Sequence, residues 1–218
     1  MPISMSRNSL IICLILFNWC FHIQYSFAAT VRVIDEQGRP FANAVISSRD
    51  LLPVSDKSTV GFSAVMDQMN KQFSPEILIV DQGTTVTFPN SDNIRHHVYS
   101  FSEPKPFEIK LYANDNVPPI LFDKPGIVVL GCNIHDSMLG YIYVKENGRV
   151  WTTNAQGIAE IEIADGEFSV WHPEFSINHL QRMPAKFDTN RDYELTFSRV
   201  SSSALNKNTF GSGKFNRQ

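Results

Sequence analysis

Cysteine, histidine and methionine lie close together in this 218-residue chain, at Cys132, His135 and Met138. Their side chains offer a thiolate, an imidazole and a thioether, which are donors that suit copper. Strongly apolar, strand-like segments flank them, so all three donors are expected on one tight turn. Two more imidazoles occur earlier, at His96 and His97, where another strand is expected to begin. Two histidines and a cysteine with a weak axial methionine form the ligand set of an electron-transfer copper site, and one histidine of this pair would complete it.

Each donor has an ordinary structural explanation when it is considered alone. Met138 suits a hydrophobic core, His135 suits a hydrogen-bonded loop, and Cys132 suits a buried, inert thiol. The combination favours a metal site, because Cys132 is the only cysteine left once the expected leader segment is removed. A lone thiol in an oxidising compartment forms no internal disulfide, and metal binding would protect it from oxidation.

Other chemistries fit the sequence less well. Methionine is a poor zinc ligand, and the sequence has no Cys-x-x-Cys motif. A dinuclear copper centre would need a second cysteine beside Cys132, and a multicopper oxidase would need His-x-His pairs, which the sequence lacks. It also lacks the Gly-x-Ser-x-Gly motif of a hydrolase. A net charge of −3 without a basic run gives no indication of a nucleic-acid partner.

Residues 1–28 are expected to be a cleaved secretory signal peptide. Arg7 precedes a short apolar segment, Leu10 to Ile23, and small residues occupy positions −3 and −1 if cleavage follows Ala28. This segment is too short to span a bilayer comfortably, so no membrane span is expected in the mature chain. An uncleaved anchor is the alternative. The protein is therefore predicted to be periplasmic or secreted.

The rest of the chain has the pattern of an all-β protein. Short segments rich in Val, Ile, Thr, Tyr and Phe alternate with Gly, Pro, Asn and Asp, and long helical periodicities are scarce. Residues 157–163 alternate apolar and acidic side chains, as a strand with one buried face does. The proline-containing segment 105–119 is expected to be a long connection, and the polar tail 201–218 is expected to be disordered.

The segment from Gly61 to Lys145 resembles the cupredoxins, the small blue copper proteins that include plastocyanin and amicyanin. "FSPEILIVDQGTTVTFPNSD" is similar to the strand pair that begins that fold, and "PGIVVLGC" is similar to its Pro-Gly-x-aromatic-x-aromatic-x-Cys motif. The Cys-x-x-His-x-x-Met loop is the short form typical of amicyanin. The arrangement also resembles exported plastocyanin-like proteins labelled methylamine utilisation proteins. The resemblance implies a Greek-key β-sandwich that binds one type 1 copper ion.

Carried onto this sequence, the resemblance implies three equatorial copper ligands and an axial one: His96, Cys132, His135 and Met138. The family has His-Asn-Val where this chain has His96-His97-Val98, so His96 takes the ligand position and His97 replaces the asparagine. Strand alternation supports this choice, since His97 and Tyr99 should share the face opposite His96 and Val98. Two roles stay open for His97, which either braces the ligands from behind or exchanges places with His96.

Two flanking segments resemble the halves of a carboxypeptidase regulatory-like β-sandwich. "VRVIDEQGRPFANAVI" contains a Val-x-Asp-x-x-Gly-x-Pro start, and "TTNAQGIAEIEIADGEFSVWHP" contains a Thr-x-x-x-Gly turn. The resemblance implies one sandwich made of residues 29–60 and 146–200, into which a cupredoxin domain of residues 61–145 is inserted. The alternative is a single enlarged cupredoxin with extra strands.

The predicted function is one-electron transfer by a mononuclear copper protein that is not an enzyme. By resemblance, the redox partners would be a c-type cytochrome or a periplasmic dehydrogenase, and the contact patch should be small and include Leu139. Copper storage, delivery or sensing without electron transfer is the alternative, and a purely structural module is a third. His172 and His179 are expected to be surface or packing residues, and Met66 and Met69 to lie on opposite faces of a strand.

Overall fold

Strands make up nearly all of the regular structure. The computed structural model describes residues 29–48, 62–113, 117–146, 148–162, 166–187 and 191–200. Apart from one short 3-10 helix, η2 (Pro173–Phe175), every element of this part of the chain is a strand, so the prediction of an all-β protein is confirmed. No helix in the described ranges is long and apolar enough to cross a membrane. The expected signal peptide and the expected disordered tail lie outside the described residues.

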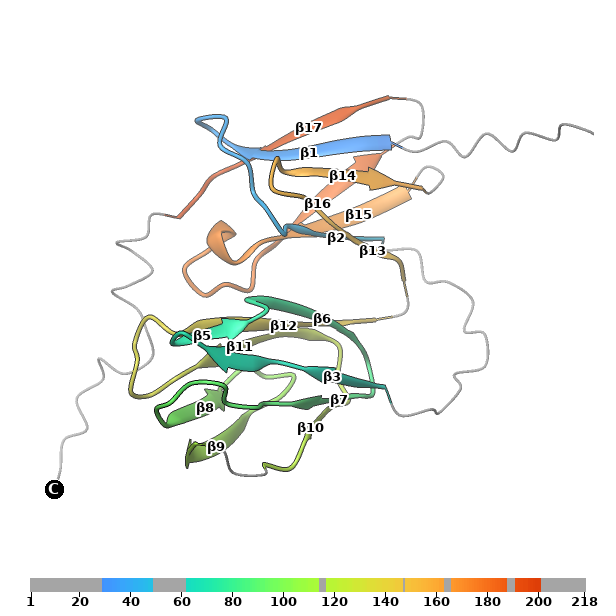
Figure 1. The fold of residues 1–218 in the computed structure, drawn as a ribbon. Coiled ribbons are helices and arrows are strands. Elements are labelled where there is room, and N and C mark those ends of the chain that lie inside the picture. The colour runs from blue at the N-terminus through green and yellow to red at the C-terminus, as the bar shows by residue number, and fades with distance from the viewer. Residues whose placement is uncertain are drawn as a thin grey trace, which may run out of the picture.

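The first and last strands of the chain form one unit, which we call the flanking sandwich (upper part of Figure 1). One sheet has the order β14-β1-β17 and the other the order β13-β2-β15-β16. Phe41, Ile46 and Phe168 contribute to the apolar core of this unit. The strand bounds are β1 (Ala29–Asp35), β2 (Val45–Ser48), β13 (Val150–Thr152), β14 (Ile158–Ile161), β15 (Gly166–Trp171), β16 (Arg182–Phe187) and β17 (Tyr193–Phe197).

The strands between them form a second unit, the central sandwich (lower part of Figure 1). Its larger sheet has the order β6-β12-β11-β8-β9, its smaller sheet the order β10-β7-β3, and β4 pairs with β5. Phe88, Val128 and Ile142 contribute to its core. The strand bounds are β3 (Ser63–Val65), β4 (Asp67–Met69), β5 (Gln72–Ser74), β6 (Ile77–Asp81), β7 (Thr84–Thr87), β8 (His96–Ser100), β9 (Phe107–Tyr112), β10 (Ile120–Phe122), β11 (Gly126–Gly131) and β12 (Leu139–Lys145).

The order of pairing agrees with an insertion. Strands β1 and β2 pair with β13 to β17, although the whole central sandwich separates them in the chain. The inserted domain stays a prediction, as does the alternative of a single enlarged sandwich with extra strands. The domain boundaries at residues 61 and 145 stay predictions.

Strands β11 and β12 are buried on both faces, because the flanking sandwich covers the outer face of the larger sheet at these two strands. Val128 and Ile142 point into the central core, whereas Val129 and Tyr141, one position along each strand, pack against Trp171 of β15. Strands with two covered faces have nearly continuous apolar sequences, as these two do. The full set of buried side chains in this contact is Val45, Ile127, Val129, Tyr141, Tyr143 and Trp171.

The prediction of a long connection over residues 105–119 is wrong. The segment contains β9, which pairs antiparallel with β8 and buries Ile109 and Tyr112 in the central core. Prolines lie before and after this strand rather than inside it, so they remove no hydrogen bond from the ladder. The positions of Met66, which is buried, and Met69, which is 43% exposed, agree with the expected opposite faces.

His172 and His179 are both buried packing residues, as expected. The Nδ1 atom of His172 accepts the backbone N–H of Glu174 at 3.2 Å, so its Nε2–H donates to the carbonyl of Ala42 at 3.2 Å. The ring packs against Phe41, with 5.0 Å between centroids. Burial, together with the nearby charge of Arg199, lowers the pKa of His172 to about 4.

This histidine should make stability depend on pH. As the pH falls from about 6.5 to about 4, the unfolded chain takes up a proton at His172 while the folded chain does not. The free energy of unfolding of the metal-free protein should therefore fall by at most roughly 3 kcal/mol. Urea unfolding at several pH values measures this loss. His172→Gln should flatten the dependence over this range. An unchanged slope in the variant would show that His172 is not held neutral by the fold.

Candidate metal centre

The loop between β11 and β12 presents Cys132 and His135 side by side. Two consecutive turns form it, since the N–H of His135 donates to the carbonyl of Cys132 at 3.3 Å and the N–H of Met138 to that of His135 at 2.9 Å. Strand β8 pairs with β11 where Tyr99 meets Gly131, the residue before Cys132. This pairing brings His96 to the cysteine across 36 positions of sequence.

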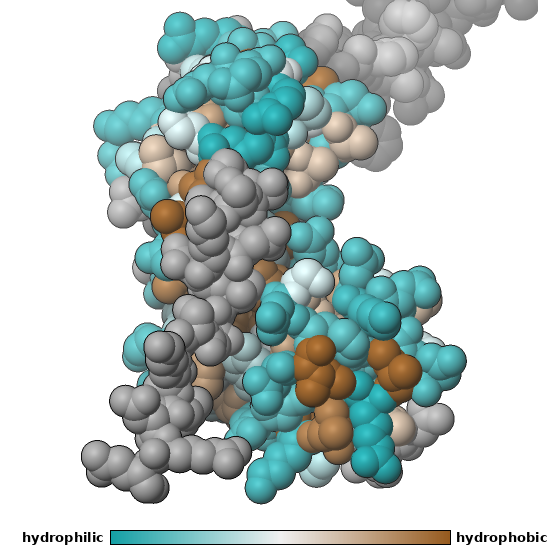
Figure 2. All heavy atoms as spheres, turned by 90° about the vertical axis from the view of Figure 1, so that its left-hand side faces the viewer, coloured by the Kyte–Doolittle hydropathy of each residue, from teal (hydrophilic) through white to brown (hydrophobic). Residues whose placement is uncertain are grey.

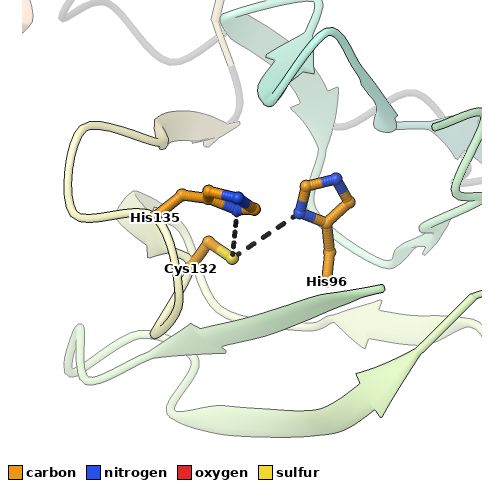
Figure 3. Close-up of side chains that lie close together, drawn as sticks. All are labelled: His96, Cys132 and His135. Atoms are coloured by element: carbon orange, nitrogen blue, oxygen red, sulfur yellow. Dashed lines mark hydrogen bonds between the residues drawn. The ribbon is translucent and has the colours of Figure 1, made fainter. Parts of the chain in front are cut away.

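The donor atoms of three residues converge (Figure 3). The Sγ atom of Cys132 lies 3.7 Å from Nδ1 of His96 and 3.7 Å from Nδ1 of His135. All three atoms lie within 4.8 Å of one another, and they form the one such group of three or more His, Cys, Asp or Glu donors in the described part of the chain. A metal at about 2.0 Å from nitrogen and 2.3 Å from sulfur with trigonal angles would set sulfur and nitrogen about 3.7 Å apart. The spacing therefore suits a trigonal metal site.

Burial separates these donors from water on all sides but one. His96 is fully buried and Cys132 is 3% exposed, whereas His135 is half-buried. Burial and the neighbouring His96 lower the pKa of His135, which favours the neutral imidazole that a metal needs. Exclusion of water around the thiol also limits its oxidation. The site is therefore closed except near His135.

Met138 closes the same loop and is 1% exposed. Its side chain belongs to the apolar core that also includes Cys132. A thioether in such surroundings has no water to compete with it as a weak ligand. The axial role of Met138 stays a prediction.

Asp92 supports His96 from behind, a contact that sequence reasoning missed. The Nε2 atom of His96 lies 2.7 Å from Oδ2 of Asp92. The backbone N–H groups of Asn70 and Lys71, in the turn between β4 and β5, donate to the two oxygens of this carboxylate at 2.7 and 2.9 Å. Burial alone would raise the pKa of Asp92, but the hydrogen bonds from Lys71, His96 and Asn70 hold it below its usual value. The carboxylate thus fixes the His96 tautomer that leaves the Nδ1 lone pair free to bind a metal.

His97 points to the other face of β8. Its Nε2 atom lies 2.8 Å from Oε1 of Glu108 on β9, and its ring lies 5.5 Å from that of Tyr99. Of the two adjacent histidines, the structure places His96 beside the thiol. His97 lies on the opposite face of β8 from the thiol, and a bracing role for it stays a prediction.

Known structures match part of this chain. Residues covering 44% of it match a copper-containing nitrite reductase from Thermus scotoductus SA-01 at 29% identity with a TM-score of 0.38, and span 25% of that protein. A purple cupredoxin from Nitrosopumilus maritimus matches 38% of this chain over 99% of its own, at 22% identity and a TM-score of 0.33. A reduced Cu(I) form of a mutant amicyanin matches 47% of this chain over 99% of its own length, at 20% identity and a TM-score of 0.35. No protein-family model and no curated protein matches the sequence.

Proposed function

We propose that the central sandwich is a cupredoxin that binds one copper ion and passes single electrons between redox partners. The observation that carries this is the convergence of the Cys132 sulfur with the Nδ1 atoms of His96 and His135. A bound copper ion would take up and release one electron as it changes between Cu(II) and Cu(I). Two paired strands and a short hydrogen-bonded loop hold the donors, so the chain need move little when the charge changes.

His135 is the proposed electron port, because it is the one donor of the three that reaches the surface. Ile134 beside it is 50% exposed. Figure 2 looks onto the end that carries the β11–β12 loop, and apolar side chains gather there on the central sandwich among polar ones. A small apolar patch of this kind suits brief encounters with a redox partner.

The proposal includes a cellular location and a class of redox partner. The leader pattern of residues 1–28 supports export to an oxidising compartment such as the periplasm. The partners would be a c-type cytochrome or a periplasmic dehydrogenase. A substrate would have to reach a donor set that is buried except at His135, which favours electron transfer through the protein over catalysis at the metal.

A redox titration of the copper-loaded protein tests the proposal. One electron per copper should be taken up and released reversibly. His96→Gln should abolish this behaviour, whereas His97→Gln, the matched change one position along, should still bind copper, because His97 points away from the thiol. Tight Cu(I) binding without reversible oxidation would contradict the carrier and support copper storage or delivery instead.

A further inference from the structure

A cleft of about 480 Å³ lies between the two sandwiches, where β12 leads into β13 (right-hand side of Figure 1). Ser47, Ser169 and Arg182 line it from the flanking sandwich. Tyr143 and Lys145 line it from the central one. The metal loop lies at the other end of the seven-residue strand β12, roughly 20 Å away. The cleft is therefore separate from the candidate metal centre.

The strand register explains why the contact between the sandwiches opens here. Val45 of β2 pairs with Trp171 of β15, and both side chains are buried in that contact. The next pair on the same face of this sheet is Ser47 and Ser169. Two serines are too small to fill the space that a valine and a tryptophan fill one pair earlier. Hydroxyl groups thus line the space in place of apolar atoms.

Hydroxyl groups of both sandwiches form a chain along the cleft. Tyr143, which is 2% exposed, donates to Oγ of Ser47 at 3.1 Å. The Oγ atom of Ser47 lies 2.8 Å from Oγ of Ser169. When Ser47 donates to Ser169, the hydroxyl hydrogen of Ser169 is free to bind a ligand. The chain then ends in a donor, which suits a ligand with acceptor oxygens.

The charged side chains that line the cleft are three cations and one carboxylate: Lys145, Arg149, Arg182 and Glu146. Lys145 pairs with Asp81 at 3.0 Å. Arg149 donates to the carbonyl of Glu162 at 3.1 Å, but neither arginine forms an ion pair within the described part of the chain. Water could satisfy the hydroxyl groups of the cleft, but it would not balance the charge of two guanidinium groups.

Stacking orients the guanidinium group of Arg182. Its Cζ atom lies 4.9 Å from the centroid of the Tyr143 ring. A guanidinium group held over an aromatic face keeps the N–H groups at its edge available for two parallel hydrogen bonds to an oxyanion. Arg182 also pairs across the sheet with Trp171, so the buried contact between the sandwiches holds the strand that carries it.

We infer that this cleft binds a small dianion through phosphate or carboxylate oxygens, and that the ligand bridges the two sandwiches. Arg182 and Arg149 would balance its charge, and Ser169 would donate a further hydrogen bond. A ligand held by both units should stabilise the folded chain as its concentration rises. The site uses no copper donor, so it does not depend on the proposed electron transfer.

Calorimetric titration of the mature protein, with and without copper, tests the inference at low ionic strength. The probes are inorganic phosphate and succinate above neutral pH, where both are mainly dianions. At least one should bind at one site per chain and raise the melting temperature, and the tighter of the two identifies the preferred oxygen group. Arg182→Gln should weaken binding by about tenfold or more. Arg149→Gln and Ser169→Ala should each weaken it several-fold.

Arg32→Gln is the matched control. Arg32 is another exposed arginine of the flanking sandwich, but it lies on β1 of the other sheet and pairs with Glu194 at 3.2 Å. This variant should bind both dianions as the wild type does. Equal weakening in Arg182→Gln and Arg32→Gln would show a general charge effect and overturn the inference. The absence of saturable binding by both dianions, or equal binding of chloride at the same ionic strength, would also overturn it.

Discussion

Replacing Asp92 with asparagine is expected to weaken copper binding by about ten- to a hundredfold and to raise the reduction potential. Both carboxylate oxygens accept hydrogen bonds, Oδ1 from Asn70 and Oδ2 from Lys71 and His96. An amide has one accepting oxygen, so its nitrogen must face at least one of these donors. His96 would lose its fixed orientation, and loss of the negative charge would disfavour Cu(II) relative to Cu(I).

Competition titration with a copper chelator measures the affinity, and voltammetry measures the potential. Asp81→Asn is the control, because Asp81 pairs with Lys145 at the surface, at 3.0 Å, and has no contact with a donor. It should change neither quantity. Copper affinity and potential equal to those of the wild type in Asp92→Asn would mean that the carboxylate does not support the metal site.

Replacing Trp171 with alanine is expected to cost about 3–5 kcal/mol of folding free energy. Trp171 is fully buried between the two sandwiches, with Tyr141 and Tyr143 at centroid distances of 5.8 and 5.7 Å. Its Nε1–H donates to the carbonyl of His179 at 2.8 Å. Truncation would leave a cavity and would remove the indole N–H that the buried carbonyl of His179 accepts.

Urea unfolding of the metal-free protein measures this loss. Leu121→Ala, at an exposed position, should change stability by about 0.5 kcal/mol or less. Trp171→Phe should retain much of the packing and lose the hydrogen bond. If Trp171→Ala were as stable as the wild type, the two sandwiches would not be held together by this contact.

The metal donors that lie on one loop could be predicted from sequence. Cys132, His135 and Met138 lie within one short loop, so their spacing alone brings them together. Choosing His96 over His97 needed only strand alternation, because one residue of such a pair must face the core and its neighbour must face outward. The structure has this alternation, with His96 buried and His97 directed toward Glu108.

The residues that hold the metal donors in place could not be predicted in the same way. Asp92 stands four residues before His96, but its role depends on the N–H groups of Asn70 and Lys71, which only the fold brings to it. Positive φ angles of 55° and 59° at these two residues turn the backbone toward the carboxylate, and a sequence pattern does not report them. The sequence gives only a weak indication of the contact at Trp171. The apolar residues of β11 and β12 occupy both faces of each strand, which indicates that both faces are covered but not by which element.

The absorption spectrum of the copper-loaded mature protein, recorded together with that of Cys132→Ser, tests the account most directly. A thiolate bound to Cu(II) in a trigonal site gives an intense blue band, so the wild type should show the band and the serine variant should not. A colourless wild-type protein with Cu(II) bound, or a band that persists without the thiol, would contradict a copper centre built on Cys132.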